Sequence, residues 1–548
     1  KRLLQIVIVL IGISFITFAL TFMSPGDPVR NMYTATGVMP TEEMVQETRE
    51  ELGLNDPFLV QYTRWLKNCL KGDFGKSYSL NKPVTELLAA RLWPTLKLTL
   101  MAMILMLVIS VPLGMLSAIY KDKWIDYLVR GITFLGCAMP NFWVGLLLML
   151  AFCVYINAFP VISSAGDFKS LFLPALTLAI AMSSKYTRQV RTAVLDELSQ
   201  DYVIGAQARG VKKSKIIWGN VFPNSLLPLI TMFGLSIGSL LGGTSVVEVI
   251  FSYPGLGNLA VSAITSSDYN LIQGYVLWLA LIYMVINLIV DASYVYIDPR
   301  MRLKSRIMKK KNRFLANKTF VVFSILAVCI ILTAVFAPVV TRGVDPLKGS
   351  LVDALLPPCK EHIFGTDKMG RDIFSRVIYG ARASLSATFG VVALIFLVGT
   401  VTGVLAGYFG GVIDAVIMRI ADMMLAFPGL VLALAVAGIM GASIKNAIIA
   451  IVVVSWTKYA RLARSLVMKI RDRDYVSAAI VTGSKTPYML FRYMLPNALP
   501  TLIITAATDI GSMMLELAAM SFLGFGAKPP APEWGYMLNE GRACMQSA

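Results

Sequence analysis

Four carboxylates lie within apolar stretches of the sequence, where a charge is costly and therefore indicates a functional role. They are Asp509, Glu516, Asp422 and Glu248. Asp509 and Glu516 are seven residues apart, so a helix would place both on one face. Such carboxylates could line a translocation path through a membrane and attract a cation or an amine. Alternatively, each could pair with a Lys or Arg of a neighbouring helix, or lie at a headgroup boundary.

Other side chains that could do chemistry are few. His362 is the single histidine, and a lone imidazole is more simply a surface residue than a metal ligand. The six cysteines show no CxxC or other metal-ligand spacing. The sequence has no GxxxxGK[ST] phosphate loop, catalytic triad or dinucleotide fingerprint. We therefore expect no enzyme activity and no ATP hydrolysis by this chain, and its metal-binding residues stay unknown.

The elements that position these groups are apolar helices. Of the 548 residues, 56% are hydrophobic and 15% are charged, whereas a soluble domain has about 25% charged residues. Several stretches reach the ~20 residues that cross a bilayer, which predicts an all-α polytopic membrane protein. We expect spans at 3–23, 94–119, 127–156, 172–193, 224–250 and 274–297, and then at 319–340, 385–408, 412–440, 445–466 and 497–526.

Basic residues dominate the net charge of +18, and they cluster. From Arg300 to Lys318 there are nine Lys or Arg and no acid, whereas residues 24–93 mix both signs. This asymmetry is typical of the positive-inside bias of membrane proteins. It predicts a cytoplasmic N-terminus, an external segment at 24–93 and contact with the lipid bilayer. It does not indicate binding to nucleic acid.

One polar segment occurs twice, because residues 186–230 align with residues 459–503 at a constant offset of 273. Both copies follow the pattern A-x3-G-x12-P and carry an Asp-Tyr pair five residues before the alanine. We expect a short helix whose small residues lie close to a partner surface and whose proline ends it. A basic amphipathic helix lying on headgroups is the alternative. The residues concerned are Asp201, Tyr202, Ala206, Gly210 and Pro223, and then Asp474, Tyr475, Ala479, Gly483 and Pro496.

Two matched prolines, Pro140 and Pro428, fall in the middle of predicted spans. Proline removes a helix hydrogen bond and bends the helix. A bend in each half could let two halves form a cavity that opens to alternate sides, and it could equally be a static packing kink.

The repeated segment resembles the EAA loop of ABC importer permeases. It departs from that pattern at Ile204 and Ser477, which replace the Glu, and at Gly205, which replaces the first Ala. The second half carries G-T-D-K-M-G-R-D-I-F-S-R at 365–376, S-F-L-G-F-G at 521–526 and P-E-W-G at 532–535. These motifs resemble the second permease of dipeptide, oligopeptide and nickel importers. G-D-F-G at 72–75 and D-P-R at 298–300 resemble the first permease.

The resemblance implies a type I ABC importer transmembrane fold with two parallel six-helix permease repeats in one chain. The first domain would be 1–300, with a coupling loop at 197–218, and a basic linker would follow at 301–318. The second would be 319–548, with an external segment at 341–384 and a coupling loop at 470–492. Nothing before Ala548 matches the last span of the first half, so we expect that helix to be missing.

The resemblance also implies partners. Two ABC ATPase subunits would dock on the cytoplasmic side and bind ATP and Mg, so this chain needs no cofactor, and an external substrate-binding protein would deliver the substrate. The setting would be a bacterial plasma (inner) membrane. T-D-I-G-S-M-M at 508–514 resembles nickel importers, so nickel or a nickel chelate is the first expectation and dipeptides or oligopeptides are the alternative. A different class, an ion-coupled secondary transporter, would use Asp509 and Glu516.

Overall fold

The chain is helical in this computed structural model, which describes residues 2–22, 27–35, 39–163, 166–226, 236, 240, 244–297, 318–425 and 428–546. These segments contain no β-strand and only three isolated β-bridges. The all-α prediction is confirmed. The basic linker expected at 301–318 lies outside the described residues except for Lys318, and so does most of the span expected at 224–250.

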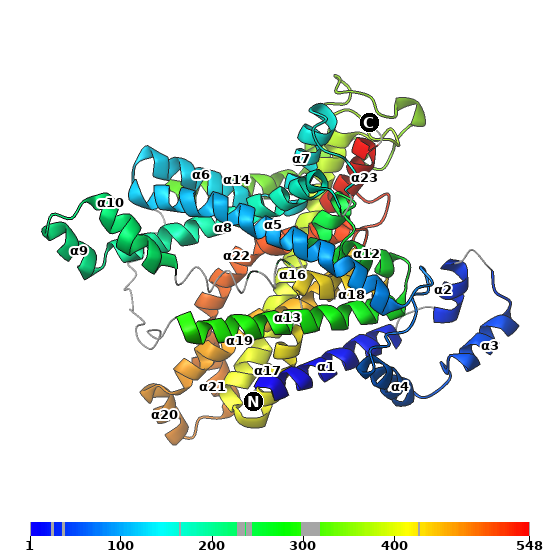
Figure 1. Ribbon diagram of the computed structural model, residues 1–548, viewed down its shortest axis with the longest axis horizontal. Coiled ribbons are helices and arrows are strands. Elements are labelled where there is room, and N and C mark those ends of the chain that lie inside the picture. Colours follow the sequence, from blue (N-terminus) through cyan, green and yellow to red (C-terminus); the bar gives the residue numbers. More distant parts are fainter. Residues whose placement is uncertain are drawn as a thin grey trace. The chain divides into compact units, whose positions relative to one another are not determined.

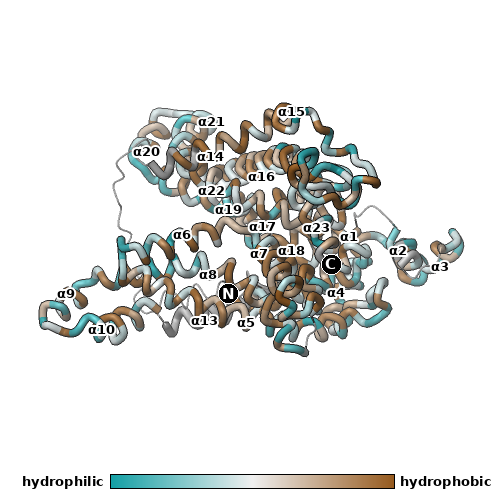
Figure 2. The backbone as a smooth tube through the Cα atoms, turned by 90° about the horizontal axis from the view of Figure 1, so that it is seen from above, coloured by the Kyte–Doolittle hydropathy of each residue, from teal (hydrophilic) through white to brown (hydrophobic). Residues whose placement is uncertain are grey.

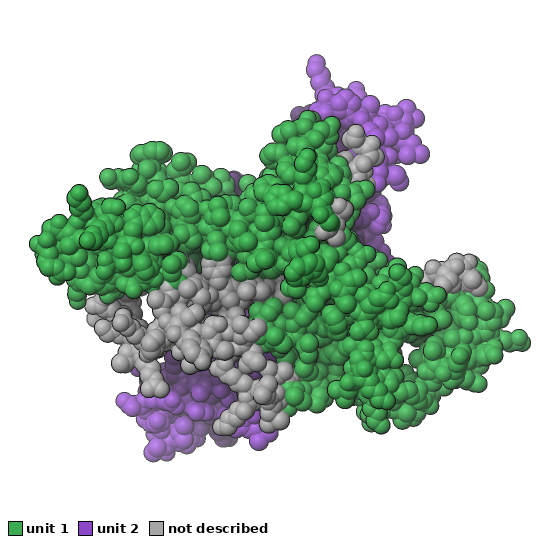
Figure 3. All heavy atoms as spheres, viewed as in Figure 1, with its two compact units in different colours: residues 1–301, 426–435, 548 green, residues 302–425, 436–547 purple. Residues whose placement is uncertain are grey.

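Two compact units make up the chain and are coloured separately in Figure 3. Unit 1 comprises residues 1–301 with 426–435 and 548, and unit 2 comprises residues 302–425 with 436–547. Figure 1 labels the helices of both units. Those of the first half are α1 (Arg2–Phe22), α2 (Pro28–Ala35), α3 (Glu42–Glu51), α4 (Phe58–Leu70), α5 (Val84–Ile119), α6 (Trp124–Ala138), α7 (Asn141–Met149), η1 (Leu150–Tyr155), α8 (Phe168–Leu198), α9 (Asp201–Ala208), α10 (Lys213–Ile216), η2 (Ile217–Val221), α12 (Leu256–Thr265) and α13 (Tyr269–Ile297).

The second half is built from the same kinds of helices. They are α14 (Lys318–Val335), α15 (Ala337–Val340), η3 (Leu351–Asp353), α16 (Ile373–Phe409), α17 (Gly411–Leu425), α18 (Gly429–Met440), α19 (Ile444–Arg471), α20 (Asp474–Val481), α21 (Thr486–Met489), η4 (Leu490–Met494), α22 (Leu495–Phe522) and α23 (Trp534–Gln546).

Several helices are suited to a bilayer. In the described residues, four are long and apolar enough to cross one, and the number rises to six if each of two bent helix pairs counts as one span. The four are Val84–Ile119, Tyr269–Ile286, Ile373–Phe409 and Thr486–Phe522. Figure 2 shows hydrophobic colouring along α16, whereas α9 and α10 are largely hydrophilic. Helices α8 and α19 cover the spans expected at 172–193 and 445–466, and each also carries several basic residues.

The span expected at 127–156 is wrong as a single helix. Helix α6 ends at Ala138, and the pair formed by α6 and Asn141–Tyr155 is bent by 100°. Pro140 precedes α7, and Met139 before it has an extended backbone (φ −85°, ψ 131°) because the proline ring disfavours the helical conformation there. Pro428 likewise lies between α17 and α18. The two prolines therefore separate helices and do not kink continuous ones.

Small residues bring the long helices of each half close together. Helix α5 packs along α8, and α16 packs along α19. A Cβ atom on Gly403 would lie 2.3 Å from the Ala460 carbonyl oxygen, and one on Gly114 would lie 2.6 Å from Val190. Residues spaced four apart share a helix face, and small side chains there let backbones approach. The two sets are Ser110, Gly114 and Ala118 in α5, and Gly399, Gly403 and Gly407 in α16.

Candidate functional site

The repeated segment forms the same sequence of elements in both halves. Helix α9 corresponds to α20, α10 corresponds to α21, and η2 corresponds to η4, each at the offset of 273 residues that aligns the two sequences. We call residues 199–218 loop 1 and residues 472–491 loop 2. Each loop follows the end of a long helix, α8 or α19. Figure 1 shows α9 and α10 beyond the end of α8.

A glycine ends the first helix of each loop. Gly210 has φ +74° and Gly483 has φ +78°, and neither has another atom within 4 Å of the position that a Cβ would occupy. The Val211 amide donates to the Ala206 carbonyl oxygen at 3.2 Å, and the Ser484 amide donates to that of Ala479 at 3.0 Å. This is the Schellman arrangement, in which a left-handed residue closes a helix. The glycine is needed for its backbone conformation, since space around it is open.

The two prolines do not end these helices, so that expectation is wrong. Pro223 follows the π-helical segment η2 and lies within helical residues 222–226. Pro496 is in the first turn of α22, directly after the π-helical η4. Proline lacks an N–H and its ring clashes with the carbonyl four residues earlier. A widened π turn removes that conflict, and the helix continues through the proline.

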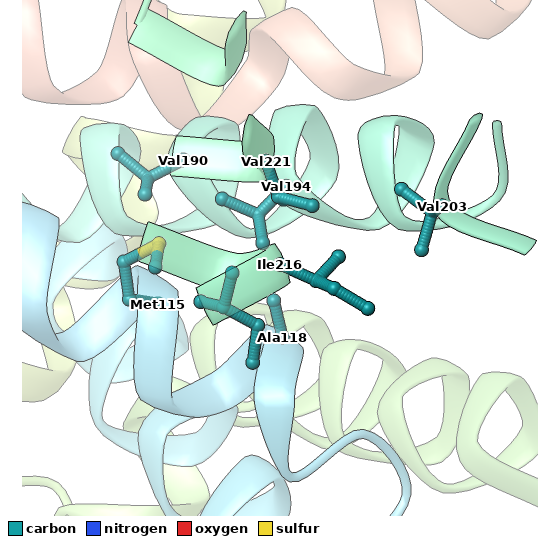
Figure 4. Close-up of a cluster of buried hydrophobic side chains, with 8 residues drawn as sticks. Met115, Ala118, Val190, Val194, Val203, Ile216 and Val221 are labelled. Carbon is teal, nitrogen blue, oxygen red and sulfur yellow. The ribbon is translucent and has the colours of Figure 1, made fainter. Parts of the chain in front are cut away.

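An apolar cluster anchors loop 1 to the long helices (Figure 4). Its members come from α5, α8, α9, α10 and η2, and Ile216 lies between side chains of α5 and α8. Val203, Ile216 and Val221 are at most 2% exposed, and the equivalent positions of loop 2 are equally buried. A movement of the loop is therefore transmitted to the helices against which it packs. The eight members are Met115, Ala118, Val190, Val194, Val203, Ile216, Ile217 and Val221.

The alanines of the pattern face the same interior. Ala206 packs against the loop 1 cluster, and Ala479 is buried. The expectation that these alanines face a partner surface is therefore wrong, because they lie three residues after Val203 and Val476 on the inward face of their helices. The residues that face outward are larger.

Each loop exposes large apolar side chains beside charged ones. Asp201 and Asp474 are exposed in the first turns of α9 and α20, where a carboxylate is favoured by the helix dipole. Exposed apolar groups on a polar loop are typical of a surface that another protein covers. They are Tyr202, Ile204 and Trp218 in loop 1, and Tyr475, Ile480, Val481, Tyr488 and Phe491 in loop 2.

A bidentate ion pair holds the stem of each loop. The Arg191 guanidinium donates two hydrogen bonds of 2.8 Å to Asp126 of α6. Arg464 makes the same two-point contact with Asp414 of α17. The sequence analysis aligned the two arginines but missed both aspartates. A signal was present, since each aspartate lies 14 residues before one of the matched prolines, Pro140 or Pro428.

The four carboxylates expected along the path lie in different surroundings. Asp509 accepts hydrogen bonds from Lys458 Nζ at 2.6 and 2.8 Å and from the Tyr459 hydroxyl at 2.9 Å. Asp422 pairs with Arg461 at 2.5 Å. Both contacts match the alternative of a basic partner on a neighbouring helix.

Glu248 and Glu516 have no basic partner among the described residues. Glu248 is fully buried and accepts hydrogen bonds from the Thr95 hydroxyl and the Asn258 amide, each at 2.9 Å. It therefore joins α5 to the start of α12. Glu516 lies on α22 two turns after Asp509, as the spacing predicted.

The G-T-D-K-M-G-R-D motif of unit 2 forms a charge network. Asp367 accepts from Arg371, and Glu540 of α23 accepts from Arg371 at 3.0 Å and from Arg376 at 2.7 Å. His362 contacts Asp372, which caps the N-terminus of α16. The histidine thus has a local partner. In the described parts of the chain, no group of three or more His, Cys, Asp or Glu is placed to hold a metal ion, and all six cysteines are free thiols.

Comparison with known proteins gives a consistent result. The family described as "Binding-protein-dependent transport system inner membrane component" matches residues 110–303 and again residues 399–548. The family "Binding-prot-dependent transport system membrane comp, N-term" matches residues 1–99. Together these matches cover more than half of the chain, and the double match confirms the predicted repeat.

Individual relatives cover about half of the chain. The oligopeptide transport system permease protein AppB of Bacillus subtilis is 40% identical over 314 residues, which are 55% of this chain and 97% of that protein. The glutathione transport system permease protein GsiC of Salmonella paratyphi A is 36% identical over 304 residues, 56% of this chain and 98% of that protein. GsiC of Escherichia coli K12 is 35% identical over the same length, with the same shares.

Proposed function

Because the chain belongs to the family of inner membrane components of binding-protein-dependent transport systems, we propose that it forms both membrane-spanning halves of an ATP-driven importer of peptides. It is a permease and not an enzyme, and ATP hydrolysis belongs to separate subunits. The observation that carries the proposal is the pair of loops with identical elements at a fixed offset. An ion-coupled secondary transporter has no use for two such loops.

Peptides take precedence over nickel as the substrate. The sequence favoured nickel, but relatives at 40% and 36% identity are oligopeptide and glutathione permeases. Nickel transport has no comparable support among the observations. The chain thus fits the alternative of the sequence analysis better than its first expectation.

The loops provide the route by which ATP would act. Loop 1 and loop 2 would each dock one ATPase subunit through their exposed aromatic and aliphatic side chains, and ATP and Mg would be bound there. The buried cluster beneath loop 1 would transmit the movement to α5 and α8, and the equivalent residues would transmit it to α16 and α19. Movement of this kind is typical of transporters that alternate access to a site near the membrane midplane.

The remaining partners follow from charge and membership of the family. Basic residues at 300–318 place the linker and the N-terminus in the cytoplasm under the positive-inside rule. Segments 24–93 and 341–384 would then face outward in the inner membrane and meet the binding protein.

Uptake in cells tests the proposal. The chain is expressed with its ATPase and binding protein in a strain that lacks its own peptide and nickel importers, and uptake of labelled di-, tri- and oligopeptides, glutathione and nickel is measured. We expect peptide uptake that is abolished by Gly210→Asp with Gly483→Asp, whereas Gly219→Ala retains it. Uptake that survives the double substitution would remove the loops from the mechanism, and nickel uptake without peptide uptake would restore the first expectation.

A further inference from the structure

Two equivalent helices carry the same three basic residues but differ in how these are neutralised. The basic residues are three positions apart and lie in the loop-side half of each helix. They are Lys185, Arg188 and Arg191 of α8, and Lys458, Arg461 and Arg464 of α19.

In unit 2, each of these cations has its own carboxylate. Lys458 Nζ lies 2.6 Å from Asp509, and an Arg461 nitrogen lies 2.5 Å from Asp422. Arg464 binds Asp414 through two nitrogens. The three basic residues of α19 are therefore balanced by three acids on α17 and α22.

In unit 1, only the third cation has an acid. Arg191 binds Asp126, whereas the described residues give neither Lys185 nor Arg188 an ion pair. Arg188 donates to the Cys137 sulfur at 3.2 Å. The offset that aligns the matched prolines places Phe134 opposite Asp422, so the acid that Arg461 binds is replaced by an aromatic ring.

Ser236 stands where unit 2 has Asp509. The two residues are 273 positions apart, and the Tyr186 hydroxyl is hydrogen-bonded to Ser236 as the Tyr459 hydroxyl is to Asp509. The geometry is therefore kept and the negative charge is lost. Residues 202–247 contain no Asp or Glu, and Glu248 is fully buried against Thr95 and Asn258.

Two cations on a helix of the membrane domain need an anion. Lys185 is about 26 Å along α8 from Phe168 at 1.5 Å per residue, within the ~30 Å of a hydrocarbon core. A positive charge at such a depth is costly unless it is paired. Both side chains are exposed on their own unit, so an anion from outside it can reach them.

We propose that Lys185 and Arg188 bind the carboxylate of the transported peptide, on the loop side of the membrane. This proposal rests on the proposed peptide transport. Its basis is that the equivalent cations Lys458 and Arg461 bind carboxylates in unit 2. A guanidinium matches a carboxylate in geometry, and the neighbouring hydroxyls of Tyr186 and Ser236 add donors. These two cations thus select peptides with a free C-terminus.

Transport of paired substrates tests this selection. The complete transporter is reconstituted in vesicles with its ATPase and with binding protein saturated by either a tripeptide or the same tripeptide as its C-terminal amide. The wild-type protein is expected to move the free acid faster. Lys185→Gln with Arg188→Gln should reduce uptake of the free acid by at least about tenfold, the value of a charged hydrogen bond, and leave the amide unchanged. The uptake ratio of acid to amide then approaches one.

A matched variant transfers the acid of unit 2 to unit 1. Ser236→Asp should occupy Lys185 and lower the acid-to-amide ratio, whereas Lys169→Gln, on the same helix far from the pair, should keep it. ATP hydrolysis stimulated by the binding protein shows that each variant is folded and coupled. The proposal is overturned if the ratio stays at the wild-type value in both test variants. It is also overturned if uptake in the double variant follows the anionic lipid content and not the peptide terminus. Absence of uptake of any peptide by the wild-type protein would instead refute the proposed function.

Discussion

Arg191 and Asp126 join α8 to α6 through two parallel hydrogen bonds, with the carboxylate entirely shielded from solvent. The contact lies close to loop 1, and Arg464 with Asp414 repeats it beside loop 2. A bidentate pair fixes both distance and rotation. The stem of each loop is thus held at a defined angle to the neighbouring helix.

Asp126→Asn should destabilise unit 1. The substitution leaves the Arg191 guanidinium without its counter-charge, and breaking a buried pair costs about 3–5 kcal/mol. The measurement is the thermal unfolding midpoint of the purified transporter in detergent, with Asp196→Asn, exposed on the same helix, as the control. Replacing both partners by apolar residues should recover part of the loss, and an unchanged midpoint in Asp126→Asn would contradict the structural role of the pair.

Gly210→Ala should loosen loop 1 without any steric clash. No atom lies within 4 Å of the added methyl group, but the positive φ costs an L residue about 1–2 kcal/mol. Hydrogen–deuterium exchange of residues 201–216 is expected to become faster by about five- to thirtyfold if the helix end opens locally. Gly219→Ala is the matched control, since it has equal space and an ordinary helical backbone. Equal exchange in both variants would show that the backbone conformation is not what requires glycine.

Gly403→Ala should separate α16 from α19. The added carbon would lie 2.3 Å from a backbone oxygen, which no side-chain rotation relieves. Overpacking of this kind costs about 1–3 kcal/mol, so the unfolding midpoint should fall. Gly390→Ala, on the same helix with no atom within 4 Å, should be neutral or slightly stabilising because alanine favours helices. A midpoint that is the same in the two variants would argue against close packing of these helices.

Cys69 should react slowly with alkylating reagents. Burial, together with the nearby Asp73 carboxylate, raises the pKa of this thiol to about 12. At pH 8 only about one thiol in ten thousand is then the reactive thiolate. Mass spectrometry of the iodoacetamide-treated protein should show modification of Cys69 that rises about tenfold per pH unit between pH 8 and 10. The exposed Cys359 should be modified first, and a plateau for Cys69 below pH 9 would exclude the raised pKa.

Much of the architecture could be predicted from hydrophobicity and from the repeat. Long apolar runs gave the positions of α5, α13, α16 and α22, and the offset of 273 residues gave the two loops with matching elements. Hydrophobicity could not show that Pro140 separates two helices, since an apolar run looks the same whether it is straight or bent by 100°.

The partners of charged residues were harder to predict. Asp509 and Lys458 are 51 residues apart and meet only because α19 and α22 pack together. Asp126 drew no attention because it lies at the start of an apolar stretch, where acids are common. Comparing the two halves residue by residue would have paired Asp126 with Asp414 and revealed the missing acids at Phe134 and Ser236.

The π-helical segments η2 and η4 stand at the same place in both halves, between a loop and the helix that follows it. A π turn contains about one residue more than an α turn. If that residue joined the regular spiral, everything beyond it would turn by about 100° around the helix axis, since an α-helix has 3.6 residues per turn. Each half therefore contains a torsional joint that can rotate a loop without breaking the chain of hydrogen bonds, and the two joints are equally placed for the loops to turn in concert.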